Sequence, residues 1–194
     1  MKKSFLIFIA LVAAMQVFSQ NNFSLSASKI QLNGTSTLHD WSADVTKASG
    51  TANMSVTGNE LVSIKSLNIS MDAKSLKSSK GSTMDKNMNK TLKTSEHPKI
   101  TFVLDKVKSI APKGNNYEIK AEGKLTIAGT TKTISMTVSG QAKGNDFVFK
   151  GSQMVKMTDY NVEPPVMMLG TLKTADEVTI NFEATFANSG ISMN

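Results

Sequence analysis

The chain contains no cysteine. It can therefore form no disulfide, cannot be acylated on a cysteine as bacterial lipoproteins are, and cannot offer a thiolate to a metal or a substrate. Its stability must come from a packed interior rather than from covalent cross-links.

The chain also contains no arginine, although its formal net charge is +7. Nucleic-acid binding favours arginine forks beside stacking aromatics, whereas most aromatics here follow a strand-like alternation. The sequence therefore predicts no nucleic-acid partner. The positive charge keeps the protein soluble, and it leaves open a transient contact with an anionic membrane surface. The oligomeric state stays open.

Histidine is scarce, with only His39 and His97 in the chain. Neighbouring residues on a strand point to opposite faces, so Asp40 is badly placed to orient His39 as a catalytic base. The sequence has no nucleophile elbow, no histidine pair at metal-binding spacing and no acidic calcium loop. We expect no catalytic residue, no metal and no cofactor. A hydrolase acting on lipid or ester substrates through His39, or an enzyme using His97, is the alternative.

Residues 1–19 resemble a secretory signal peptide. A basic start at Lys2 and Lys3 precedes an apolar stretch, and Ser19–Gln20 is the expected cleavage site. The apolar stretch is shorter than the ~20 residues that a membrane-spanning helix needs, although a retained anchor is an alternative. We expect export to the periplasm or the outside, as a single domain over residues 20–194 with a net charge reduced by two, to +5.

Residues 117–138 predict a β-hairpin. Apolar residues alternate with polar ones on both sides of the segment 128–132, which gives the ribbon one dry and one wet face. Two strands cannot bury a dry face alone, so further strands must curl over it.

Similar strand signals recur along the chain, at 29–33, 41–56 with an interruption at Gly50, 61–71, 100–104, 147–157 and 178–186. About eight short amphipathic strands favour an all-β, antiparallel barrel or sandwich over a parallel sheet. A barrel of this size is either just filled by its side chains or holds one small ligand.

One segment predicts a short inserted helix instead. Ser82 offers an N-cap with Asp85 three residues later, Met84 and Met88 follow at helical spacing, and His97 before a proline ends the helix. Six lysines surround it, and they either keep it solvated or meet anionic head groups; they are Lys74, Lys77, Lys80, Lys86, Lys90 and Lys93.

Methionine is abundant, and its flexible side chain suits surfaces that adapt to varied apolar ligands, although it also fills gaps in ordinary cores. The apolar loop at 163–170 contains Met167 and Met168. We expect this loop to fold over the barrel mouth as a lid or plug rather than to stay exposed.

Several stretches resemble the YceI family of exported lipocalin-like barrels. The similar segments are Ser36–Trp41, His97–Phe102, the Gly123–Lys132 hairpin and Val178–Phe182, in the family's order. The resemblance implies a barrel with a long apolar tunnel for a polyisoprenoid or related lipid. The family often has an arginine near the loop at 157–160, which this chain lacks, so the resemblance does not supply the head-group contacts.

We therefore expect an exported lipid-binding protein for an isoprenoid or quinone-like molecule. The expected tunnel lining is Trp41, Leu67, Ile69, Met71, Phe102, Leu104, Tyr117, Ile119, Leu125, Met136, Phe147, Phe149 and Phe182. Four methionines are expected at its ends: Met84, Met88, Met167 and Met168. An integral outer-membrane barrel and a filled barrel without a ligand are further alternatives.

Overall fold

The computed structural model of the chain describes residues 20–189, without the side chains of Gln20, Met167 and Met168. The expected signal peptide, residues 1–19, lies outside the described residues. The strands are β1 (Gln20–Ser36), β2 (Trp41–Val45), β3 (Ala48–Thr57), β4 (Glu60–Asp72), β5 (Leu76–Ser78), β6 (Lys99–Lys113), β7 (Asn116–Ile127), β8 (Thr130–Lys143), β9 (Asp146–Lys156), β10 (Val166–Met167) and β11 (Leu172–Asn188). The helices are η1 (Ala73–Ser75), α1 (Ser82–Thr91), η2 (Thr158–Tyr160) and η3 (Met168–Gly170).

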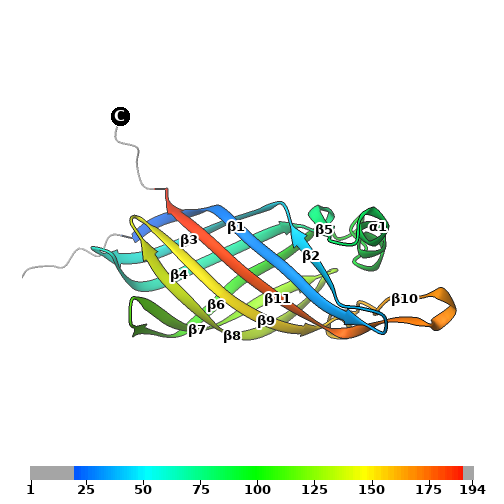
Figure 1. Ribbon diagram of the computed structural model, residues 1–194. Helices are drawn as coiled ribbons and strands as arrows, with labels where there is room; N and C mark the ends of the chain where they lie inside the picture. Colours follow the sequence, from blue (N-terminus) through cyan, green and yellow to red (C-terminus); the bar gives the residue numbers. More distant parts are fainter. Residues whose placement is uncertain (1–19, 190–194) are drawn as a thin grey trace, which may run out of the picture.

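Eight of these strands close into an antiparallel barrel (Figure 1). They follow the order β1-β3-β4-β6-β7-β8-β9-β11, and β11 pairs with β1 to complete the ring. The short strands β2, β5 and β10 extend the sheet beyond it. The expected lipocalin-like barrel with one α-helix is confirmed.

The long strand β1 is shared between two neighbours. Residues 20–24 of β1 pair with β3, whereas residues 30–34 pair with β2. The segment expected as one strand at 41–56 is therefore two strands. The break falls at Thr46 and Lys47, where the backbone instead pairs with Ser75, and not at Gly50.

Two other local expectations are corrected. The turn after β7 has only two residues, Ala128 and Gly129, and both adopt the positive φ that tight hairpin turns favour. Helix α1 ends at Thr91 rather than at His97, and its N-cap is Gly81. Asp85 accepts hydrogen bonds from Lys77 Nζ and the Ser78 amide, so it fastens α1 to β5 instead of completing a capping box.

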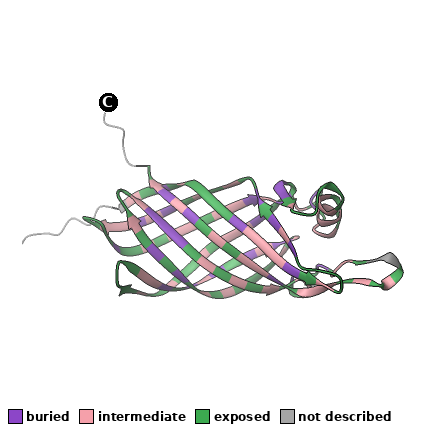
Figure 2. Ribbon diagram, in the orientation of Figure 1, coloured by how far each residue is buried: buried purple, intermediate pink, exposed green. Residues whose placement is uncertain are grey.

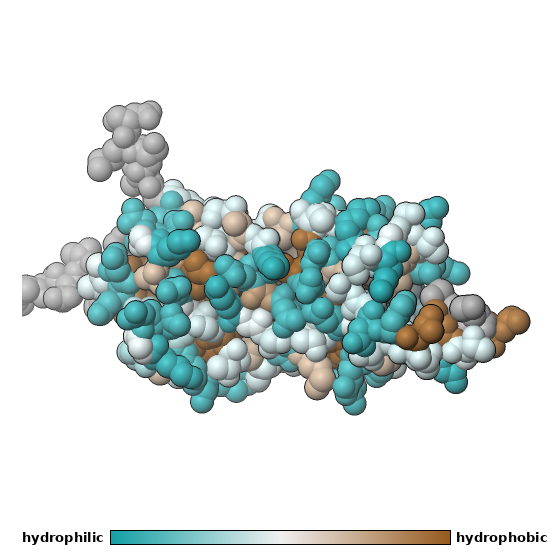
Figure 3. All heavy atoms as spheres, viewed as in Figure 1, coloured by the Kyte–Doolittle hydropathy of each residue, from teal (hydrophilic) through white to brown (hydrophobic). Residues whose placement is uncertain are grey.

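Buried and exposed residues alternate along the strands, as Figure 2 shows. On β7, Ile119, Leu125 and Ile127 point inward and are buried, while Lys120 and Lys124 point outward. Polar side chains dominate the visible outer face (Figure 3). Among residues 20–189, no helix has the length and apolar character needed to cross a membrane.

Candidate binding tunnel

The interior of the barrel holds two adjoining apolar cavities. The mouth chamber, near α1, has a volume of about 110 Å³, and the inner chamber, in the middle of the barrel, has a volume of about 120 Å³. Ile30, Met71 and Ile180 line both chambers, so these three side chains form the boundary between them.

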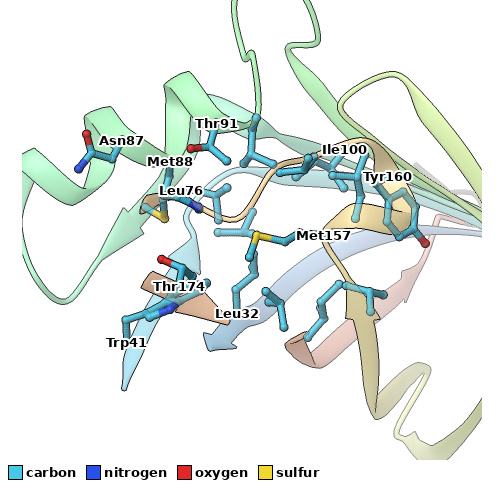
Figure 4. Close-up of a pocket in the computed structure, with 18 of the residues that line it drawn as sticks. Leu32, Trp41, Leu76, Asn87, Met88, Thr91, Ile100, Met157, Tyr160 and Thr174 are labelled. Carbon is cyan, nitrogen blue, oxygen red and sulfur yellow. The ribbon is translucent and has the colours of Figure 1, made fainter. Parts of the chain in front are cut away.

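The mouth chamber lies between the barrel wall, α1 and the connection from η2 to β11 (Figure 4). Met84 and Met88 face it from α1, Trp41 from β2, and Met157 and Tyr160 from the end of β9 and from η2. Its polar side chains belong to Asn87, Thr91, Thr174 and Tyr160. No charged side chain of the described residues lines this chamber.

The inner chamber is lined by apolar side chains from every strand of the ring except β3. Gln153 is the only polar residue among the described ones that line it, and its Nε2 donates a hydrogen bond to the Met154 carbonyl at 2.9 Å. Part of its amide is thus occupied by the backbone, and the chamber wall is almost wholly hydrocarbon.

Glycines on neighbouring strands help to keep this interior hollow. Phe182 pairs with Gly151 across β11 and β9, and a methyl group on Gly151 would lie 2.6 Å from Phe182 Cζ. Trp41 pairs with Gly34 in the same way, and its indole ring occupies the space a Gly34 side chain would need. Both rings therefore lie against the wall over a glycine, which leaves the axis open.

The end of the barrel opposite α1 is filled. Phe23 packs edge-on against Phe147, with ring centroids 5.7 Å apart, and Phe149 packs edge-on against Phe186 at 5.9 Å. Phe23, Phe186 and Met54 are at most 2% exposed. We call these five residues the aromatic plug: Phe23, Met54, Phe147, Phe149 and Phe186. Among the described residues, the tunnel is thus closed at the plug and leads outward toward α1.

Two carboxylates hold the loops around the mouth. Asp176 on β11 accepts hydrogen bonds from the Thr158 amide at 2.8 Å and from the Thr158 hydroxyl at 2.7 Å, which fixes η2. These bonds lower the pKa of Asp176. The Ser78 amide, with a smaller contribution from Lys77, lowers the pKa of Asp85.

Tyr160 on η2 is 2% exposed. Burial, with a smaller contribution from Asp159, raises the pKa of its hydroxyl, so the tyrosine stays neutral. Asn161, which follows it, has a positive φ and donates from Nδ2 to Thr130 Oγ1 at 3.0 Å. This contact joins η2 to the start of β8 and presents Tyr160 to the chamber.

Most residues that the sequence predicted as lining do meet at the cavities. Trp41, Met84 and Met88 line the mouth chamber, and Met71 lines both. The inner chamber contains Leu67, Ile69, Phe102, Leu104, Ile119, Leu125, Met136, Phe149 and Phe182.

Two predicted residues are placed elsewhere. Tyr117 lies at the far end, where its hydroxyl accepts a hydrogen bond from the Leu61 amide at 3.2 Å and lines an outer crevice. Phe147 belongs to the plug and faces neither chamber. Alternation along a strand predicts the inward face, but it does not tell where along the axis the tunnel stops.

The expected lid at residues 163–170 is not what the structure has. The hairpin that contains β10 extends past the end of the barrel (Figure 1), with Leu169 fully exposed and Val166 58% exposed. Of the described side chains of this hairpin, Pro165 at its base alone lines the mouth chamber. The side chains of Met167 and Met168 lie outside the described part of the chain.

The sequence analysis missed several lining residues. Ile30, Leu32 and Ile180 could have been found, because they alternate with polar neighbours in the strands at either side of the barrel seam. Tyr160 and Val162 follow no periodic pattern, and only the folding of η2 over the barrel end brings them to the chamber.

The histidines lie outside both chambers. His39 is exposed in the β1–β2 turn, where its Nδ1 is 3.4 Å from the Ser36 hydroxyl, but that hydroxyl donates to the His39 carbonyl at 2.7 Å. His97 packs over Gly129 in the β7–β8 turn. Within residues 20–189, no group of three or more metal-binding side chains exists.

Comparison with known families identifies the fold. Residues 20–186 match the model of the YceI-like domain. The chain belongs to this family. No curated protein matches it.

Solved structures agree on the architecture. The polyisoprenoid binding domain from Saccharophagus degradans, implicated in plant cell wall breakdown, superimposes with a TM-score of 0.66 at 12% identity, over 88% of this chain and 99% of that one. BcnA of Burkholderia cenocepacia has a TM-score of 0.62 at 23% identity, over 81% of this chain and 95% of its own. The YceI protein of Campylobacter jejuni gives 0.62 at 19% identity, over 77% and 85%.

Proposed function

We propose that this protein is an exported, soluble carrier that sequesters an isoprenoid or quinone-like lipid in its barrel. The observation that supports this most is the pair of adjoining apolar chambers, which are closed at the aromatic plug and lead outward beside α1. Membership of the YceI-like family and the named ligand class of the Saccharophagus relative support the same ligand.

The chambers suit hydrocarbon better than water. A buried apolar cavity of about 150 Å³ stays dry and accepts a benzene-sized ligand. Each chamber here is somewhat smaller, at about 110 and 120 Å³, so the two in line favour a narrow, unbranched or methyl-branched chain over a compact molecule. Each buried methylene contributes about 0.8 kcal/mol, so a tail of modest length offsets the cost of association without polar anchors.

The closed end sets the orientation of the ligand. The tail enters first and stops at Phe149 and Phe186, which line the inner chamber from the plug side. The head group then remains in the mouth chamber, among the hydroxyl and amide groups of Thr91, Thr174 and Asn87. Since no described charged residue lines that chamber, a neutral head group fits better than a pyrophosphate.

A hydrolase acting through His39 has less support. His39 is exposed on a turn outside the chambers, and the nearby Ser36 hydroxyl is engaged by the backbone. An outer-membrane barrel also fits poorly, because the outward face of β7 carries Lys120, Glu122 and Lys124 where a lipid-facing wall is apolar. Ester turnover that disappears in His39→Ala would support the hydrolase alternative.

The decisive experiment extracts the lipid that the protein holds when purified from its own cells, followed by mass spectrometry. Phe102→Asp and Val103→Asp form a matched pair on adjacent positions of β6. Phe102 faces the inner chamber, whereas Val103 is 43% exposed on the outer face.

We expect Phe102→Asp to lose at least about tenfold of the bound lipid, since a carboxylate in hydrocarbon is strongly unfavourable. Val103→Asp should keep it. The carrier would be refuted if the two folded variants held equal amounts of lipid. It would also be refuted if the wild type neither co-purified with lipid nor took up added isoprenoid.

Export is tested separately. Cell fractionation should find the mature chain outside the cytoplasm, with Gln20 at its N-terminus. A protein that keeps residues 1–19 and sediments with membranes would instead support the retained anchor.

A further inference from the structure

We propose that the mouth end of the barrel docks onto an anionic lipid bilayer, with the hairpin tip (residues 166–170) entering the bilayer interface. In this arrangement the lysines of the helical cap (residues 73–99) contact the head groups. This inference deepens the proposed function, because it assigns the surface through which a carried lipid would pass.

Exposed apolar side chains gather at the mouth end. Leu169 is fully exposed at the hairpin tip, Val166 is 58% exposed beside it, and Leu38 is 71% exposed in the β1–β2 turn. That turn lies against the base of the hairpin, since the Thr37 amide donates to the Lys173 carbonyl at 2.9 Å. Figure 3 shows the apolar surface of the hairpin standing out from a largely polar wall.

The helical cap beside the hairpin is basic. It contains seven lysines against two carboxylates, Asp85 and Glu96, which leaves it a net charge of +5. Lys77 is paired with Asp85. The other six form no salt bridge within residues 20–189; they are Lys74, Lys80, Lys86, Lys90, Lys93 and Lys99.

The hairpin is not basic, so the hairpin supplies apolar contact with the membrane and the cap supplies electrostatic attraction. Glu163 precedes the tip and Lys173 pairs with Val166, while Asp176 and Glu177 follow on β11, so the net electrostatic attraction comes from the cap. An apolar tip next to unpaired lysines is the combination that binds anionic bilayers.

The opening of the tunnel lies between these two parts. Met84 and Met88 of the cap and Pro165 of the hairpin all line the mouth chamber. Both parts extend beyond the barrel on the same side, as Figure 1 shows. A bilayer that touches the cap and receives the tip therefore covers the mouth, so a lipid can pass between membrane and tunnel without crossing water.

The absence of cysteine makes a direct test possible. A polarity-sensitive fluorophore is attached to Leu169→Cys at the tip, or to Asn115→Cys in the β6–β7 turn at the other end. Vesicles of phosphatidylglycerol and phosphatidylcholine should shift the emission of the label at 169 to shorter wavelength, and spin-labelled lipids should quench it. The label at 115 should not respond.

Binding variants separate the two contributions. Leu169 has a φ of +55°, which asparagine tolerates well, so Leu169→Asn should keep the fold and weaken vesicle binding by about tenfold. Val62→Asn, at an exposed apolar position near the other end, is the matched control and should bind normally. Lys86→Glu should weaken binding to anionic vesicles about fivefold or more, and Lys143→Glu, with the same charge change, should not.

Several outcomes would overturn the proposal. Equal responses of both labels would point to a membrane anchor elsewhere, including residues 1–19. A label at 169 that responds to protein concentration without vesicles, together with a dimer in solution, would assign the tip to a second copy of the chain. A protein that holds lipid but gives no response at 169 would refute docking and leave the carrier intact. Docking without any bound lipid would refute the carrier and leave docking intact.

Discussion

The two ends of the barrel are built on opposite principles. At the far end, aromatic rings meet edge to face and close the barrel, whereas at the α1 end methionines, threonines and one tryptophan border a cavity. The hairpins at the far end turn through Gly58, Gly114 and Gly144, while the mouth end carries a helix and a long apolar hairpin. Both halves contain a buried apolar cluster, but the far end is closed and ligand access lies at the mouth end.

The largest expected difference between the two ends is in the stability cost of substitutions, and it is greatest in the aromatic plug. Phe186→Ala should lower the free energy of unfolding by about 3–5 kcal/mol, because it removes a fully buried ring and enlarges the cavity beside it. Met88→Ala, which removes a half-buried side chain bordering the mouth chamber, should cost less than about 1 kcal/mol and still reduce lipid retention. Urea denaturation measures both, and equal costs would mean that the ends are not distinct.

A second variant tests whether the two chambers act as one tunnel. Ile180 lines both, so Ile180→Trp should obstruct the passage while filling space that is already empty. We expect long-chain isoprenoids to bind at least about tenfold more weakly, with short ones affected less. Asn181→Trp, on the outer face next to it, is the control for the added ring. Undiminished long-chain binding by Ile180→Trp would mean that the ligand stays outside the inner chamber.

A third variant concerns the hollow at the mouth. Gly34→Ala should push the only tryptophan, Trp41, away from the wall, at a cost of about 1–3 kcal/mol. Its fluorescence maximum should shift, and a lipid added afterwards should change the emission less than it does in the wild type. An unchanged spectrum would show that the indole ring does not depend on the space above Gly34.

The smallest expected effect is on pH dependence. The folded-state pKa values of Asp85 and Asp176 lie below the ordinary 3.8, so their contribution to stability is present above that pH and is lost as the pH falls through the folded values. Below pH 3.8, amide exchange corrected for intrinsic rates should therefore rise first at residues 77–97 and 157–163. Asp176→Asn should remove the pH dependence at 157–163 only. Simultaneous loosening of the far-end turns would contradict this.

Much of the barrel follows from its sequence, and so does most of its lining. Strict alternation in β7, β8 and β11 identifies the inward face, because a strand has only two faces and one must be dry. Leu125, Met136 and Phe182 were found in this way, and they line the inner chamber.

The remainder depends on contacts distant in sequence. Phe147 and Tyr117 have the same local pattern as true lining residues, and only the packing of β1 and β4 against them places them at the closed end. The exposed hairpin tip was misjudged for a related reason, because apolar composition alone does not tell a lid from a contact surface. The sequence predicted Asp85 as part of a capping box, but its carboxylate accepts a hydrogen bond from the Ser78 amide instead.

Methyl NMR of the methionines during titration with an isoprenoid tests the central claim most directly, because these residues sample every environment at issue. Met88 and Met157 line the mouth chamber, Met136 the inner chamber, and Met71 both, whereas Met54 lies in the plug and Met154 is 55% exposed on the outer wall. We predict that the first four signals shift on binding and that those of Met54 and Met154 stay in place. Shifts confined to Met154, or none at Met71 and Met136, would mean that no lipid enters the barrel.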